Sequence, residues 1–280
     1  MALKKPRSLR EALEDKLSAW ELSMVPRSFD VVGDIAVIEF PEELAGKEKV
    51  IADALIKTFR NINVVVEKTS EVSGEYRTRG LRVIAGESRT TTVHKEYGLR
   101  YAMDLKSAYF SPRLGTERAR VAEKVKKGEK VLVMFAGVGP YAILISKKSD
   151  AGEVYAVELN HDAVEYMKEN IKLNKAGNVF ALEGDAGVKV PELVNKAGKF
   201  DRIIMPLPKD AGSFLDAALP ALRENGTIHF YYFARDPGEA VEKVREISMN
   251  LGYEIEILEA VECGSYSPCL SRICIDFKIK

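Results

Sequence analysis

Residues 131–158 read VLVMFAGVGPYAILISKKSDAGEVYAVE, and this stretch decides the fold. It opens with an apolar run, Val131–Phe135, which is too short for a helix and is typical of a buried strand. A glycine turn follows at Ala136–Gly139. Pro140 then stands at the expected first residue of a helix, where its missing N–H would find no intrahelical partner anyway. The helix leads to a second apolar strand that ends on Glu158, so a carboxylate is expected at the strand tip.

This strand–turn–helix–strand unit suits a ligand that contains a nucleoside. The glycines would let the ligand approach the backbone, the unpaired N–H groups attract an anionic group, and Glu158 can accept hydrogen bonds from ribose hydroxyls. Gly137, Gly139 and Ala142 also satisfy the loose dinucleotide pattern G-x-G-x-x-G/A, so an NAD-type oxidoreductase stays open. A tight strand-to-helix turn without a ligand is the alternative explanation of the glycines.

The composition excludes several classes of protein. The 280 residues include 42 basic and 42 acidic ones, so a polyanionic partner must be met by a local patch rather than by net charge. No apolar run approaches the roughly 18 residues that span a bilayer, and the start, MALKKPRSLREAL, lacks the apolar core of a secretory signal. Cys263, Cys269 and Cys274 form no C-x-x-C pair, which favours reduced thiols. We therefore predict a cytoplasmic protein with no membrane segment and no metal site.

Residues 1–104 are expected to form a small α+β domain. Ser8 and Glu11 form a capping-box pattern at the start of a helix whose apolar face extends from Leu9 to Trp20. A second helix is predicted over Lys47–Arg60. Strands are expected over Phe29–Phe40 (two short ones around Gly33), Asn63–Glu67, Leu81–Ala85 and Thr91–Lys95.

Basic residues are concentrated in one segment of this neutral chain. Between residues 77 and 120 ten basic residues meet only four acids, and five aromatic residues are interleaved with them. The ten are Arg77, Arg79, Arg82, Arg89, Lys95, Arg100, Lys106, Arg113, Arg118 and Arg120. This local excess suggests a phosphate-rich partner whose bases stack on the aromatic rings. A solvated strand face above core aromatics is the alternative.

Strands and helices alternate through the rest of the chain. Helices are predicted over Asp162–Leu173, Gly212–Leu222 and Pro237–Leu251, and strands over Val179–Leu182, Phe200–Met205, Gly226–Phe233, Tyr253–Val261 and Ser271–Lys278. The alternation predicts a parallel, doubly wound α/β sheet with helices on both faces. The last two strands are joined by Glu262–Leu270, which is too short for a helical crossover, so they should pair antiparallel. Class I S-adenosylmethionine (SAM)-dependent transferases show such an antiparallel end, so residues 105–280 are expected to form a Rossmann-like domain of that type.

In such a sheet, ligands bind beyond the carboxyl ends of the strands. There Asp185 can accept a hydrogen bond from the adenine amino group, and Ala186 offers a backbone N–H. Each acid taken alone is equally explained as a loop carboxylate or a helix cap. The predicted cofactor site at these strand ends consists of Phe135, Ala136, Gly137, Gly139, Glu158, Leu159, Asp185 and Ala186.

Five motifs together resemble one family. They are GEYRTRG (residues 74–80), FSPRLGTERAR (110–120), FAGVGP (135–140), NIKLNK (170–175) and PLPK (206–209). The family comprises the archaeal and eukaryotic tRNA guanine-37 N1-methyltransferases and the related tRNA wybutosine-synthesising enzymes. The resemblance covers nearly the whole chain. It implies SAM as the cofactor, a Rossmann-like catalytic domain, and a smaller N-terminal domain that faces the anticodon region of tRNA. We expect the protein to be a monomer.

Pro206 is expected to distinguish the two branches of this family. In the N1-methyltransferases the matching residue is an asparagine that helps to position the target guanine, whereas proline offers neither a side-chain amide nor an N–H. A Pro-Leu-Pro end resembles the wybutosine branch, which transfers the 3-amino-3-carboxypropyl group of SAM to C7 of the tricyclic base at position 37 and releases methylthioadenosine. We therefore expect an aminocarboxypropyltransferase. The alternatives are an N1-methyltransferase, an NAD-type oxidoreductase and a catalytically inactive tRNA-binding module.

The resemblance also implies roles for individual residues. Glu117 matches the proposed base of the N1-methyltransferases and forms the expected catalytic set with Arg118, Pro206 and Pro208. The residues that would hold the amino-acid end of the cofactor are Ser107, Tyr109, Phe110 and Arg118. Those that would contact the tRNA or its base are Arg77, Arg79, Arg82, Arg89, Arg113 and Lys209.

Overall fold

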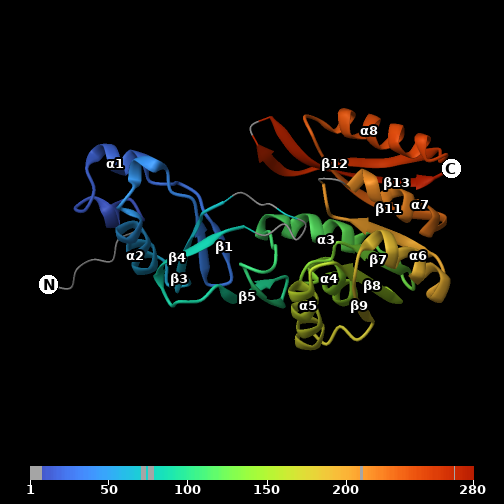
Figure 1. Ribbon diagram of the computed structural model, residues 1–280, viewed down its shortest axis with the longest axis horizontal. Helices are drawn as coiled ribbons and strands as arrows, with labels where there is room; N and C mark the ends of the chain where they lie inside the picture. The colour runs from blue at the N-terminus through green and yellow to red at the C-terminus, as the bar shows by residue number, and fades with distance from the viewer. Residues whose placement is uncertain (1–7, 71–73, 75–78, 209–210, 268) are drawn as a thin grey trace. The chain divides into compact units, whose positions relative to one another are not determined.

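The computed structural model describes residues 8–70, 74, 79–208, 211–267 and 269–280 (Figure 1). The chain divides into two compact units, one made of Met1–Lys95 with Ala102–Pro112 and the other of Glu96–Tyr101 with Arg113–Lys280. The domain boundary expected after residue 104 stays a prediction. Two residues of the predicted site, Arg77 and Lys209, lie outside the described residues.

The first unit contains a four-stranded sheet in the order β1-β2-β3-β4. Its strands are β1 (Asp30–Val32), β2 (Ile35–Ile38), β3 (Val64–Lys68) and β4 (Leu81–Gly86). β2 and β3 are parallel and the two outer pairs are antiparallel. Helix α2 (Glu48–Thr58) connects the parallel pair and buries the face that carries Ile51 and Leu55. The apolar period of 3.6 residues in this segment therefore predicts the helix correctly.

The N-terminal helix expected from Leu9 to Trp20 does not form as one element. The chain instead makes a 3₁₀ turn η1 (Glu11–Leu13) and a separate helix α1 (Ala19–Met24), and Trp20 is 59% exposed. The physical reason is a second cap, because the Ser18 side chain accepts from the Glu21 N–H while the Glu21 carboxylate accepts from the Ser18 N–H. A 3₁₀ turn η2 (Glu42–Leu44) precedes α2.

A two-stranded hairpin supplies residues to both units. It consists of β5 (Thr91–Glu96) and β6 (Leu99–Asp104), and its turn residues Tyr97 and Gly98 have φ angles of 51° and 81°. Positive φ at both central positions is the geometry that joins strands with a tight two-residue turn. The strand β6 was not predicted from the sequence.

The second unit contains a seven-stranded sheet in the order β12-β13-β11-β10-β7-β8-β9 (Figure 1). The strands are β7 (Lys130–Met134), β8 (Glu153–Glu158), β9 (Val179–Glu183), β10 (Phe200–Met205), β11 (Leu222–Ala234), β12 (Ile255–Ser267) and β13 (Leu270–Ile279). The five strands from β7 to β11 are parallel to one another, and β13 pairs antiparallel with both β11 and β12. The predicted doubly wound α/β sheet with an antiparallel C-terminal strand is confirmed.

Helices cover this sheet on both faces. They are α3 (Gly115–Glu123), α4 (Pro140–Lys148), α5 (His161–Leu173), α6 (Ala186–Ala197), α7 (Leu215–Ala221) and α8 (Pro237–Asn250), with 3₁₀ turns η3 (Pro112–Leu114) and η4 (Ala211–Phe214). A large apolar core lies between the sheet and the helices α6, α7 and α8, with Phe200, Phe230 and Phe277 fully buried in it. Burying each such ring contributes about 1.5–3 kcal/mol.

The boundaries of several elements differ from those expected. Helices α3 and α6 were not predicted, and the helix expected over Gly212–Leu222 is a 3₁₀ turn followed by the shorter α7. The loop expected over Glu262–Leu270 is largely strand, because β12 continues to Ser267. Among the described residues, none of the helices is long and apolar enough to span a membrane.

Candidate active site

The turn after β7 departs from ordinary backbone geometry. Phe135, Gly137 and Gly139 have φ angles of 55°, 56° and 87°, and Phe135 is not a glycine. A left-handed conformation costs roughly 1–2 kcal/mol at a residue that has a Cβ. Gly139 must also be small, because a Cβ there would lie 2.9 Å from Cγ of Met167 on α5. Strain of this kind accumulates at binding sites, which supports a ligand at this turn.

Glu158 holds the same turn from the tip of β8. Its Oε2 accepts a hydrogen bond from the Gly137 N–H at 2.7 Å, and its Oε1 accepts from the Asn160 N–H at 2.9 Å. Burial raises the pKa of the Glu158 carboxyl, and these N–H donors oppose that rise. The carboxylate is thus half-buried and already orders the backbone that a nucleoside would approach.

Asp185 and Ala186 stand at the end of the next strand. The Asp185 side chain caps α6 by accepting from the Val188 N–H at 3.2 Å, and Ala186 is the first residue of that helix. The Gly184 N–H donates to the Glu158 carbonyl at 2.9 Å, which joins the ends of β8 and β9. The helix-cap explanation of Asp185 is therefore correct for one carboxylate oxygen. Its second oxygen makes no hydrogen bond with the described residues.

One residue beside this edge was missed from the sequence. The Phe214 ring meets the Phe135 ring edge-on, with centroids 4.8 Å apart, and lies 4.0 Å from the Cβ position of Gly187. A half-buried aromatic ring next to Asp185 and Ala186 fits one face of an adenine base. The sequence could not predict this role, because a single phenylalanine in the segment after PLPK does not show whether its ring lies at the site or in the core.

The strand ends thus assemble most of the predicted cofactor site. The residues that lie together at the carboxyl ends of β7, β8, β9 and β10 are Phe135, Ala136, Gly137, Gly139, Glu158, Leu159, Asp185, Ala186, Pro206 and Pro208. Two carboxylates, backbone N–H groups and an aromatic wall are the groups that an adenosine moiety requires. The residues present therefore fit SAM.

Glu117 and Arg118 of α3 are both buried in ion pairs. Arg120 donates to both carboxylate oxygens of Glu117, at 2.7 and 2.8 Å, and the Tyr231 hydroxyl donates to Oε1 at 2.5 Å. The Arg118 Nε donates to Glu96 at 2.8 Å, and the Arg118 side chain is 2% exposed. Burying a guanidinium requires a counter-ion, and Glu96 provides it. The role of Arg118 at the amino-acid end of the cofactor stays a prediction.

Three further predicted residues belong to the first unit. Ser107, Tyr109 and Phe110 follow β6, and Tyr109 and Phe110 line a cavity of about 80 Å³ together with Arg79. Their grouping with the strand ends of the second unit around one cofactor stays a prediction, as does the tRNA contact of the exposed Arg113.

Much of the predicted basic segment is neutralised by folding. Arg82 pairs with Glu67 at 2.7 Å, and Arg89 donates to Asp34 and Glu87. Arg118 and Arg120 bind acids as well, including Asp276 from β13. The local excess of six charges therefore overstates the free positive charge, because a count along the sequence omits the acids that tertiary structure brings in.

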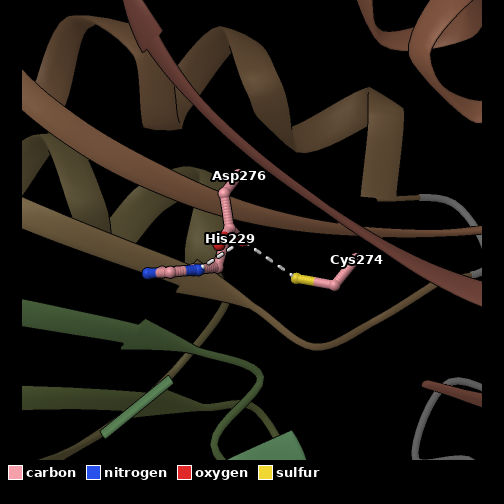
Figure 2. A group of neighbouring side chains, drawn as sticks. All are labelled: His229, Cys274 and Asp276. Carbon is pink, nitrogen blue, oxygen red and sulfur yellow. Dashed lines mark hydrogen bonds and ion pairs between the residues drawn. The ribbon is translucent and has the colours of Figure 1, made fainter. Parts of the chain in front are cut away.

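A cluster of potential metal ligands joins β11 and β13. Figure 2 shows His229, Cys274 and Asp276, whose ligand atoms lie within 4.8 Å of one another. Nδ1 of His229 lies 2.6 Å from Asp276, while its Nε2 lies 2.7 Å from Nη1 of Arg202. Burial lowers the pKa of His229 and raises that of Cys274, so we assign a neutral imidazole that donates to Asp276 and accepts from Arg202.

The charges around this cluster argue against a cation. The Asp276 carboxylate already accepts from Arg120 and from Lys124, at 2.8 and 2.7 Å. Arg202 binds His229 as well, so three positive groups contact the side chains that would ligate a metal ion. The cluster is thus a buried ionic network that joins α3, β10, β11 and β13.

The fold and the strand-end site define a SAM-dependent transferase of class I. Models of two known families match the chain: the TRM5/TYW2 methyltransferase domain over residues 92–256 and the TYW2 N-terminal domain over residues 9–90. The chain therefore belongs to the TRM5/TYW2 family.

Individual relatives agree with this assignment. The chain is 45% identical over 258 residues to the tRNA (guanine(37)-N(1))-methyltransferase Trm5b of Pyrococcus abyssi, covering 91% of this chain and 76% of the relative. It is 37% identical to Trm5b of Methanocaldococcus jannaschii, covering 99% and 78%. The crystal structure of the Pyrococcus abyssi Trm5b superposes with a TM-score of 0.86 at 42% identity and covers 99% of this chain and 82% of that one.

The prediction of an aminocarboxypropyltransferase, which was based on Pro206, is wrong. The aminocarboxypropyltransferase of Methanocaldococcus jannaschii is only 29% identical over 255 residues, against 45% and 37% for the two methyltransferases. One strand-tip residue does not determine which carbon of a sulfonium reacts, because that choice depends on how the whole pocket places the nucleophile. The cofactor prediction is confirmed for the family. Solved relatives include the Pyrococcus horikoshii TYW2 in complex with MeSAdo, at 26% identity, a TM-score of 0.80 and 99% coverage of both chains.

Proposed function

We propose that this chain transfers the methyl group of SAM to N1 of guanine-37 in tRNA. The observation that carries the proposal is the higher identity to the two Trm5b enzymes than to the aminocarboxypropyltransferase. A further support is a solved complex of aTrm5 with tRNALeu, which is 37% identical, has a TM-score of 0.86 and covers 99% of this chain and 79% of that one.

Glu158 and Asp185 would hold the nucleoside of the cofactor. Glu158 keeps the turn residue Gly137 in place and presents its carboxylate to the ribose hydroxyls. Asp185 accepts with its second oxygen from the adenine amino group, and the Phe214 ring, in contact with Phe135, covers one face of the base. The sulfonium of SAM then supplies an electrophilic methyl group.

Glu117 would accept the proton that guanine N1 loses. Arg120 and Tyr231 occupy three of the roughly four acceptor sites of its carboxylate, two on Oε1 and one on Oε2. One site on Oε2 is left for the base. The same hydrogen bonds fix the carboxylate in one orientation, which reduces the reorganisation needed at the moment of reaction.

Two labels of SAM test the proposal directly. We expect methyl label to enter a tRNA transcript that carries guanine at position 37 and not the same transcript with adenine there. Carboxyl label should stay with the cofactor product. Glu117→Gln should slow the transfer by about 10²–10⁴-fold with unchanged SAM affinity. Transfer of carboxyl label without methyl label would contradict the proposal.

A further inference from the structure

The hairpin of β12 and β13 ends in a small platform of aromatic rings. Tyr266, near the end of β12, is 60% exposed and stacks on Phe233 of β11, with ring centroids 4.0 Å apart and planes inclined by 28°. The guanidinium of Arg272 lies over the other ring, with its Cζ 5.5 Å from the Phe233 centroid. An exposed aromatic face backed by a second ring is rigid and offers apolar area for stacking.

Arg272 differs from the other enclosed arginines of this unit. Arg118, Arg120 and Arg202 each bind a carboxylate, whereas within the described part of the chain Arg272 has no acidic partner. Its Nε is buried and has no hydrogen-bond partner among the described residues. A half-buried guanidinium whose charge no acid balances is costly unless an anion binds its terminal nitrogens. The missing partner of Arg272 is therefore an anion.

The platform lies at the same edge of the sheet as the candidate active site. Phe233 is the last residue but one of β11, whose parallel neighbour β10 ends at Met205, directly before Pro206. In the antiparallel pairing, Arg272 stands directly opposite Phe233. The platform and Pro206 therefore lie at the carboxyl ends of two neighbouring parallel strands.

We propose that Tyr266, Phe233 and Arg272 bind a nucleotide that flanks the modified guanine. Tyr266 stacks on its base, and Arg272 binds its phosphate through its terminal nitrogens. Single-stranded RNA loops are recognised in this way, because unstacked bases lie on aromatic rings while guanidinium groups bind phosphate oxygens in pairs. The inference rests on the proposed function, since it requires tRNA to reach this site.

A matched set of side chains elsewhere in the sheet provides the control. Phe180 is 44% exposed and stacks on Tyr155, with centroids 5.1 Å apart, and the Lys130 ammonium lies 5.6 Å from the Tyr155 centroid. These residues lie towards the amino ends of their strands, away from the candidate site, and Lys130 is paired with Glu153. This set resembles the platform in its stacked rings and nearby cation, but it lies at the other edge of the sheet and its cation has an acidic partner.

The test uses tRNA transcripts that carry 2-aminopurine at position 36 or at position 38. Binding of the wild-type chain should change the fluorescence of the probe at one of these positions. Tyr266→Ala should abolish that change and raise Kd for tRNA about 5- to 100-fold, whereas Tyr266→Phe and Phe180→Ala should behave like wild type. Arg272→Gln should raise Kd and lower the salt dependence of binding by about one phosphate contact.

SAM affinity, measured by calorimetry, should be the same in all four variants, which shows that they fold. Equal tRNA affinity and equal probe fluorescence in wild type and Tyr266→Ala, with guanine-37 still methylated, would overturn this inference alone. A wild-type chain that neither binds nor methylates the transcript would overturn the proposed function, and the inference with it.

Discussion

At the scale of single residues, Glu158 shows how one side chain serves both the fold and the site. The carboxylate was expected from the sequence as a ribose ligand at a strand tip. The structure adds that it accepts from two backbone N–H groups and is half-buried, so its removal affects the turn as well as the ligand.

Glu158→Ala should therefore weaken SAM binding and lower stability together. Loss of a charge-assisted hydrogen bond to ribose costs about 1.5–3 kcal/mol, which is roughly a ten- to hundredfold loss of affinity. The unpaired N–H groups of Gly137 and Asn160 should also lower the melting temperature. Calorimetry and thermal unfolding measure the two effects, and Glu158→Gln, which keeps the acceptor, is the control. Unchanged SAM affinity in Glu158→Ala would remove Glu158 from the site.

Asp34 forms an ion pair with Arg89 that is visible only in the folded structure. The hydrogen bonds from Arg89 are the largest cause that lowers the pKa of its carboxyl, and Thr92 and Asn63 add two further donors. Because these partners are far from Asp34 in the sequence, the local pattern could not predict the pair, and Arg89 was predicted to contact tRNA instead.

This pairing should make stability depend on pH in acid. The pKa of Asp34 is lowered in the fold and is about 3.9 in the unfolded chain, so its contribution is complete above pH of about 4 and is lost as pH falls below that. Asp34→Asn should destabilise by about 1–3 kcal/mol at pH 7, and the difference from wild type should shrink towards pH 3. Urea unfolding at several pH values measures this. Asp53→Asn, which breaks the exposed pair with Lys49, should change little at any pH.

At the scale of elements, the buried ionic network explains how α3 is attached to the sheet. Arg120 of α3 and Lys124, the residue that follows this helix, both bind Asp276 of β13, which also binds His229 of β11. Because Glu117 is held by the same Arg120, the network connects the candidate catalytic helix to the strands beside it.

Asp276→Ala should cost about 3–5 kcal/mol, because it removes the buried carboxylate that binds Arg120, Lys124 and the fully buried His229 at once. Glu259 binds the same two cations but is about half exposed, so Glu259→Ala should cost less than about 1 kcal/mol. Denaturant unfolding compares the two variants. Equal costs would show that the carboxylate on β13 has no special role in the network.

At the scale of the whole molecule, a chain of zero net charge must bind tRNA through local surface. The structure reduces the number of basic residues that can bind tRNA, because Arg89, Arg118 and Arg120 form ion pairs with acids. Arg82 also pairs with Glu67, but its side chain remains 60% exposed.

We expect tRNA affinity to fall steeply as salt rises. Arg82→Glu should weaken binding of all tRNAs alike and reduce the slope of log K against log salt by about one contact. Arg223→Glu is the matched control, because Arg223 is exposed, pairs with Asp201 and lies at the amino end of β11, away from the candidate site. If Arg82→Glu binds as wild type does while affinity still depends on salt, the contact surface lies elsewhere on the chain.

Much of the fold could be predicted because its signals are local. The apolar runs before Phe135 and Glu158, the glycine turn and Pro140 specify a strand–turn–helix–strand unit from neighbouring residues alone. Helix α6 was not predicted, because Gly187 and Pro191 are residues that disfavour a helix interior. Helix α1 begins later than expected, because a second capping box interrupts the apolar pattern.

The sequence by itself determined the alternation of strands and helices apart from α6, the antiparallel end of the sheet and the set of strand-tip residues, because each follows from periodicity and turn chemistry within a few residues. Tertiary structure alone decided the partners of Arg89 and Arg120, and the stacking of Tyr266 on Phe233 beside Arg272. These contacts join residues tens of positions apart, where no local pattern carries information. The transferred group was misjudged from Pro206 for the same reason, since it depends on the three-dimensional placement of a base against a sulfonium and not on one side chain.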